Sequence, residues 1–115
     1  MGYNGAMMKT ENPYTYYEQL ATAVAEPTPD SIISRSILKN EAADVTLFAF
    51  AAGQELTEHT ASRPAMLHFL QGEAEISLGA DKKRATVGSW VYMTPHLAHG
   101  IKAETAVIML LILLK

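Results

Sequence analysis

The chain has 115 residues, among them 12 acidic and 9 basic side chains, four histidines and no cysteine. This length favours one compact domain, and a composition of 49% hydrophobic and 18% charged residues favours a packed globule over a disordered chain. The lack of cysteine excludes disulfides, thiol catalysis and cysteine-ligated metal sites, and the formal net charge of −3 gives no support for nucleic-acid binding.

The first 30 residues differ from the rest and contain four of the five tyrosines. The chain start has no basic flank before an apolar stretch, so it does not predict a secretory signal. Residues 14–25 are expected to form a short helix, with Asn12 as its cap and Pro13 at its first position. Pro27 and Pro29 then favour an extended segment. We interpret residues 1–30 as an N-terminal arm and residues 31–115 as the body.

The body reads as short apolar segments separated by turn residues. Strands are predicted over residues 31–38, 44–51, 65–70, 73–78, 83–87, 89–93 and 101–114. With no long helix among them, this pattern indicates an all-β sandwich or barrel. The basic triplet Lys82–Arg84 is typical of a solvated turn.

The C-terminal apolar run, residues 106–114, is too short for a membrane helix, which needs about 20 residues. A final strand that is buried on both faces explains it better. We therefore expect a soluble, cytoplasmic protein without a membrane partner.

Two spaced motifs stand out in the body. Gly53, His59 and Gly72 fit the pattern G-x5-H-x-H-x3-E-x6-G, and Gly88 and His99 fit G-x5-P-x-G-x2-H. These segments resemble the two conserved motifs of the cupins, and the chain from about residue 31 to 114 is similar to the small single-domain, RmlC-like cupins. The resemblance implies a jelly-roll barrel (a double-stranded β-helix), commonly paired into a homodimer.

In metal-binding cupins, three histidines and a glutamate of these motifs hold one divalent ion. The matching positions here are His59, Ala61, Ala65 and His99, so half of that ligand set is replaced by alanine. A metal, if bound, is expected at His59 and His99, and iron, nickel, manganese or zinc suits such ligands. Two imidazoles fall short of the three protein ligands that catalytic sites usually have.

The other polar residues are weaker candidates. Glu55 shares the parity of His59 and is a conceivable third ligand, whereas Glu58 should point to the opposite face. His68 should face away from the barrel interior, where it is structural or a dimer contact, and His96 is expected at a solvated turn tip.

The two alanines leave a more apolar cavity. We expect a ligand pocket that contains His59, His99 and these alanines, with walls formed by four further side chains, Leu67, Phe69, Trp90 and Tyr92. Such a pocket suits a small, partly apolar organic molecule with one polar or anionic group facing the two histidines.

The sequence leaves several functions open. The first is a small-molecule-binding cupin with an incomplete metal site, of unknown activity. The second is a metal-dependent, oxygenase-like enzyme that uses His59 and His99 with water or a carboxylate. Metal-free acid–base catalysis ranks third, because no aspartate lies near either histidine to orient it; a purely structural role is also open.

Overall fold

The computed structural model describes residues 13–115, and nearly all of its regular structure is β-strand. The strands are β2 (Ile32–Lys39), β3 (Ala43–Phe50), β4 (Glu55–His59), β5 (Ala65–Gln71), β6 (Ala74–Leu78), β7 (Asp81–Ala85), β8 (Trp90–Met93), β9 (His99–Ala103) and β10 (Val107–Leu114). One short 3-10 helix, η1 (Leu20–Thr22), precedes them. The prediction of an all-β chain is confirmed.

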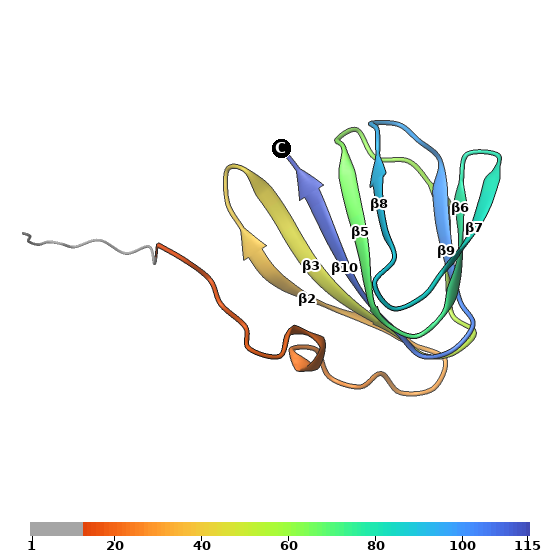
Figure 1. Ribbon diagram of the computed structural model, residues 1–115, viewed down its shortest axis with the longest axis horizontal. Helices are drawn as coiled ribbons and strands as arrows, with labels where there is room; N and C mark the ends of the chain where they lie inside the picture. The colour runs from red at the N-terminus through yellow and green to blue at the C-terminus, as the bar shows by residue number, and fades with distance from the viewer. Residues whose placement is uncertain (1–12) are drawn as a thin grey trace, which may run out of the picture.

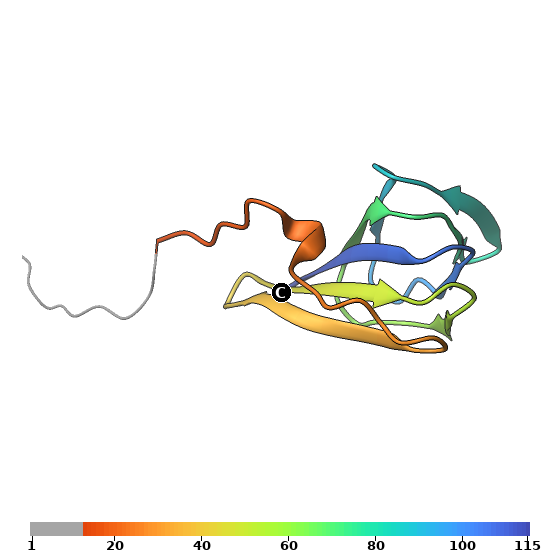
Figure 2. The ribbon, with the colours of Figure 1, turned by 90° about the horizontal axis from the view of Figure 1, so that it is seen from below.

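The strands form two sheets that face each other (Figures 1 and 2). One sheet has the order β2-β3-β10-β5-β8 and the other β4-β9-β6-β7, with every neighbouring pair antiparallel. The late strand β9 lies between β4 and β6, and β10 lies between β3 and β5, so the last two strands are inserted between earlier ones. Apart from the extra edge strand β2, this is the eight-stranded jelly roll that the resemblance implied.

The core lies between the two sheets and follows the period-two alternation of their strands. In β5, for example, Ala65, Leu67 and Phe69 are buried while the residues between them are not. The largest fully buried side chains are Leu47, Phe50, Leu67, Phe69, Met93, Val107 and Met109, and all except Leu47 belong to the central cluster. Leu47 is buried on the opposite, outer face of its sheet.

The helix predicted over residues 14–25 is wrong, because only η1 is helical and no side chain caps it. Its predicted cap, Asn12, lies outside the described residues. Tertiary contacts hold this segment instead: the Arg35 guanidinium donates to the Ala23 carbonyl at 2.7 Å and lies 5.9 Å from the centre of the Tyr17 ring. The arm is therefore fixed by the outer face of β2 rather than by its own helical bonds.

The single strand predicted over residues 101–114 is also wrong, since it is divided between β9 in one sheet and β10 in the other. The corner is made by Glu104 and Thr105, whose backbone N–H groups both donate to the Glu73 carbonyl. In β10, Val107 and Met109 face the core and are buried, and the other residues of the strand are half-buried. Within residues 13–115, no helix is long and apolar enough to span a membrane.

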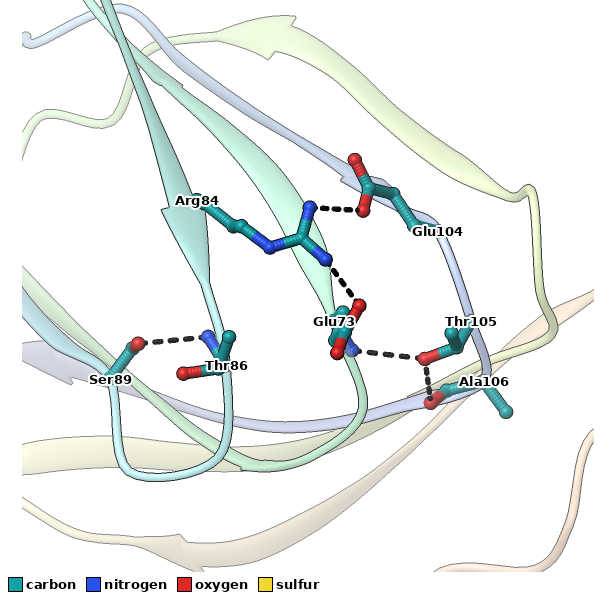
Figure 3. A network of polar contacts seen from close by, with 7 residues as sticks. All are labelled: Glu73, Arg84, Thr86, Ser89, Glu104, Thr105 and Ala106. Atoms are coloured by element: carbon teal, nitrogen blue, oxygen red, sulfur yellow. Dashed lines mark hydrogen bonds and ion pairs between the residues drawn. The ribbon is translucent and has the colours of Figure 1, made fainter.

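Two further elements differ from expectation. The strand β4 was not predicted, and β7 starts two residues earlier than expected, so that Lys82–Arg84 lies in an edge strand instead of a turn. Arg84 forms ion pairs with Glu73 and with Glu104, the latter at 2.7 Å (Figure 3). This network joins β7 to the corner between β9 and β10.

Candidate functional site

The structure brings His59 and His99 together on neighbouring strands. They are directly opposite each other in the β4–β9 pair, with ring centres 4.3 Å apart and ring planes inclined by 56°. His99 is buried, with 7% of its surface exposed, whereas His59 is exposed. The pair therefore lies at the end of the barrel where β4 ends and β9 begins, which we call the open end, with one ring buried and one exposed.

A bulge in β4 allows both rings to share one face. In β9, His99 has the same parity as Ile101 and Ala103, which belong to the core. In β4, Leu56 lies opposite Ile101 and packs against the core, and the register then shifts by one residue before His59. The extra residue lets His59, three positions after Leu56, face the same side.

The hydrogen bonds of the two rings are alike. His59 Nδ1 lies 2.9 Å from the Thr57 carbonyl oxygen, and His99 Nδ1 lies 2.9 Å from the Leu97 carbonyl oxygen. Since a carbonyl oxygen only accepts, we assign the proton of each neutral ring to Nδ1. Each Nε2 then carries a lone pair that no such bond to the backbone occupies. Metal-binding histidines are commonly oriented by this kind of Nδ1 bond.

Glu55 is not the third ligand. It lies opposite Lys102, on the exposed face of the sheet, because the bulge separates its parity from that of His59. Within residues 13–115, no group of three His, Asp or Glu side chains is arranged to hold a metal. The residues present therefore supply two ligands and do not complete the ligand set expected for a catalytic divalent ion.

The remaining histidines lie apart from the pair. His68 is in β5 and alternates with buried Leu67 and Phe69, so it faces away from the core, as predicted. His96 is exposed in the turn between β8 and β9, as predicted, and has a positive φ of 71°. It occupies the motif position where a turn glycine would stand.

The two alanines add no polar atoms from their side chains. Ala65 is buried at the start of β5, and Ala61 lies in the β4–β5 loop, where its carbonyl accepts the His96 N–H at 2.7 Å. Both motif positions are therefore present in the chain, but their side chains carry no atom that could bind a metal.

The predicted pocket wall needs one correction. Leu67 and Phe69 lie inside the barrel and are buried in its core, and their role in a ligand pocket stays a prediction. Trp90 and Tyr92, however, are 59% and 47% exposed and lie on the outer face, because Met93 takes the inward position of β8. They do not line the barrel.

Asp44 was not predicted from the sequence, and it links three parts of the chain at the open end of the barrel. Its carboxylate contacts Lys115 at 3.1 Å, Arg63 at 3.4 Å and Lys39 at 3.8 Å. The hydrogen bond from Lys115, followed by that from Arg63, holds the pKa of Asp44 below its ordinary value despite the opposing effect of burial. Arg63 belongs to the loop that follows His59, so this cluster braces the rim. The feature of the sequence that could have identified Asp44 is a single carboxylate at the start of an otherwise apolar strand.

Comparison with solved structures identifies the fold. A conserved protein of unknown function from Streptococcus pyogenes is 26% identical with a TM-score of 0.79, and the match covers 97% of each chain. A cupin superfamily protein from Desulfitobacterium hafniense is 24% identical with a TM-score of 0.78, covering 93% of this chain and 94% of that one. A cupin 2 conserved barrel domain protein from Leptotrichia buccalis is 25% identical with a TM-score of 0.75, covering 82% of this chain and 46% of that one.

Neither a protein-family model nor a curated protein sequence matches the chain. The structural matches nevertheless extend over nearly the whole chain, and the cupin jelly roll implied by the two motifs is confirmed. Because this fold supports many unrelated activities, the function has to be argued from the site.

Proposed function

We propose that this small cupin binds a small organic molecule at the open end of its barrel, with the polar group of the ligand facing His59 and His99. The observation that carries the proposal is the pair of imidazoles, with ring centres 4.3 Å apart and both Nδ1 atoms engaged by backbone carbonyls. Two polar groups that converge at one place are the usual means of orienting a ligand.

The protonation state of the two rings determines which polar groups of a ligand they can bind. A neutral ring protonated on Nδ1 presents an acceptor at Nε2, which suits a hydroxyl or amine hydrogen of the ligand. A protonated ring presents a donor there instead, which suits a carboxylate. A small hydroxy acid offers both a hydroxyl hydrogen and a carboxylate, so it combines the two preferences.

The surroundings favour an organic ligand over a tightly held catalytic ion. Ala61 and Ala65 stand where two metal ligands would be needed, and Glu55 points to the outer face. The alanine side chains carry only a methyl group, so these two motif positions add apolar atoms and no polar ones. That combination matches a partly apolar molecule with one polar group.

The second candidate is a metal-dependent enzyme in which His59 and His99 hold iron, nickel, manganese or zinc together with water or a carboxylate. The Nδ1–carbonyl bonds favour it, because they direct each Nε2 outward from its backbone anchor. When bound, such an ion would supply Lewis-acid chemistry or oxygen activation. The chain itself contributes two neutral ligands and their orientation.

One titration separates the two candidates. Protein labelled with 15N-histidine is titrated by NMR with small hydroxy acids and, separately, with Zn²⁺ and Ni²⁺, in the parent and in His59→Ala and His68→Ala variants. Our proposal expects saturable shifts of the His59 and His99 Nε2 signals with an acid, lost in His59→Ala and kept in His68→Ala.

Two outcomes contradict the proposal. The first is an untagged protein that is purified with nearly one equivalent of iron, nickel, manganese or zinc and loses it in His59→Ala, which supports the metal enzyme. The second is a pair of histidine signals that no small acid in the panel shifts.

A further inference from the structure

Asp44 lies on the inner face of the five-stranded sheet, at the open end of the barrel. Leu113 of β10 is directly opposite it, and Ala65 of β5 is opposite Leu113. Ala65 belongs to the core between the sheets and Leu113 packs against that core. Asp44 also has the parity of Phe50, which is buried in the same core, so its carboxylate is on the inner side of β3.

Arg63 reaches this carboxylate from the loop between β4 and β5. The loop, residues 60–64, leads from the sheet that carries His59 and His99 to the five-stranded sheet. Arg63 Nη2 lies 3.4 Å from the Asp44 carboxylate, although β10 stands between β5 and β3. The side chain therefore extends past the end of β10, which Figure 1 shows as the end of the chain. It lies across the open end from the two histidines.

Cationic side chains outnumber acidic ones in this cluster. Lys115 and Lys39 also contact the Asp44 carboxylate, at 3.1 Å and 3.8 Å. In the part of the chain that the structure describes, no other Asp or Glu side chain forms an ion pair with these three cations. One carboxylate cannot neutralise three cations, so an anion is favoured here.

The contact between Arg63 and Asp44 can be exchanged for a better one. Its length of 3.4 Å exceeds the roughly 2.7–2.9 Å of a charge-assisted hydrogen bond, and it uses one of the five N–H donors of the guanidinium. The two side chains are 35% and 20% exposed, and pairs that water reaches contribute little stability. Asp44 would keep its closer partner Lys115, so Arg63 can turn to a ligand carboxylate and bind both of its oxygens.

We propose that Arg63 is the anchor for a second anionic group of the ligand, and that the preferred ligand is therefore a small dicarboxylate. The inference rests on the proposed function, in which the other polar group of the ligand faces His59 and His99. Sheets that pack face to face are about 10 Å apart, so a chain of a few carbon atoms spans the space left between the imidazoles and the guanidinium. Asp44 is the positioning residue that holds Arg63 at the open end.

A matched pair of ligands tests the anchor. Malate is lactate with a carboxylate added to its methyl group, and both are titrated into the 15N-histidine-labelled protein at constant ionic strength. We expect malate to bind at least about tenfold more tightly than lactate, the gain of one charge-assisted hydrogen bond. Arg63→Gln should remove this preference and leave the affinity for lactate unchanged, which also shows that the variant keeps its binding site.

Lys39→Gln is the matched control. It removes one positive charge from the same cluster, but its side chain is 75% exposed and its contact is the longest, so the preference for malate should remain. Arg63→Lys should give an intermediate preference, because it keeps the charge and loses the planar fork. Equal affinities of the parent for malate and lactate, or equal losses of preference in Lys39→Gln and Arg63→Gln, overturn the inference.

A second label separates this inference from the proposed function. In 15N-arginine-labelled protein, the Nε–H signal of Arg63, assigned by its loss in Arg63→Gln, is followed during a titration with succinate. A saturable shift of this signal is expected, and its absence overturns the inference even if both histidines respond to an acid. If Arg63 responds and neither histidine does, the anion anchor is supported and the proposed function fails.

Discussion

A matched pair of glycine substitutions tests how the barrel holds the corner between β9 and β10. Gly53 and Gly72 have the same φ of 85°, which side chains other than glycine rarely adopt. They differ in their surroundings. A Cβ atom at Gly72 would lie 2.0 Å from the Ala106 carbonyl oxygen and 3.0 Å from Thr105 Oγ1, whereas at Gly53 nothing lies within 4 Å.

The two costs can be worked out separately. A left-handed backbone at an alanine costs about 1–2 kcal/mol, which is the whole expected effect of Gly53→Ala. Gly72→Ala adds a steric cost of about 1–3 kcal/mol, for a total of roughly 2–5 kcal/mol. The carbonyl cannot turn away cheaply, because the backbone just before it, at Glu104 and Thr105, is bonded to Glu73.

Urea unfolding followed by circular dichroism at 25 °C gives both free energies of unfolding. We expect Gly72→Ala to lose at least about 1 kcal/mol more than Gly53→Ala, with similar slopes against urea. Equal losses in the two variants would refute the reasoning, since the shared backbone strain would then be the only effect.

Three further predictions concern single residues. His96→Gly should raise the free energy of unfolding by about 0.5–1 kcal/mol, because it removes the strain of the positive φ of 71° and keeps the backbone bond to Ala61; a lower melting temperature would contradict this. Asp44→Asn should destabilise the protein at neutral pH, because its ion pairs with Lys115 and Arg63 hold the folded-state pKa below the unfolded value of 3.8. This contribution is present above that value and is lost as the pH falls through the folded-state pKa, so urea unfolding should show a smaller difference between variant and parent at pH 2 than at pH 7. Phe69→Ala should cost about 3–5 kcal/mol in thermal or urea unfolding, because the ring is 1% exposed within the core; a loss below about 1 kcal/mol would mean that Phe69 lines an open cavity instead.

The motif glycines and histidines were sufficient to predict the fold and the meeting of His59 with His99. Their spacing encodes turns and strand ends that the jelly roll requires, and Gly53 and Gly72 both have the positive φ that such turns need. The position of Glu55 could not be predicted, because a bulge changes the parity of a strand without any change in the count of residues.

The orientation of β8 was the main error in the site. Alternation showed that Trp90 and Tyr92 share one face, but it did not say which face is inside. The pairing of Ala65 with Met93 decides this, and it is a contact between strands that no single segment reveals. The helix predicted around Tyr17 is absent for a related reason. Contacts with Arg35, twelve or more positions along the chain, hold this segment in place of helical hydrogen bonds.

The position of Trp90 also has a practical consequence. It is the only tryptophan of the chain and lies in the sheet opposite the one that carries His59 and His99. Its intrinsic fluorescence therefore reports on the outer face, while imidazole resonances report on the open end of the barrel. Changes at the outer face and ligand binding at the open end thus have separate spectroscopic signals, and both can be followed in one histidine-labelled sample.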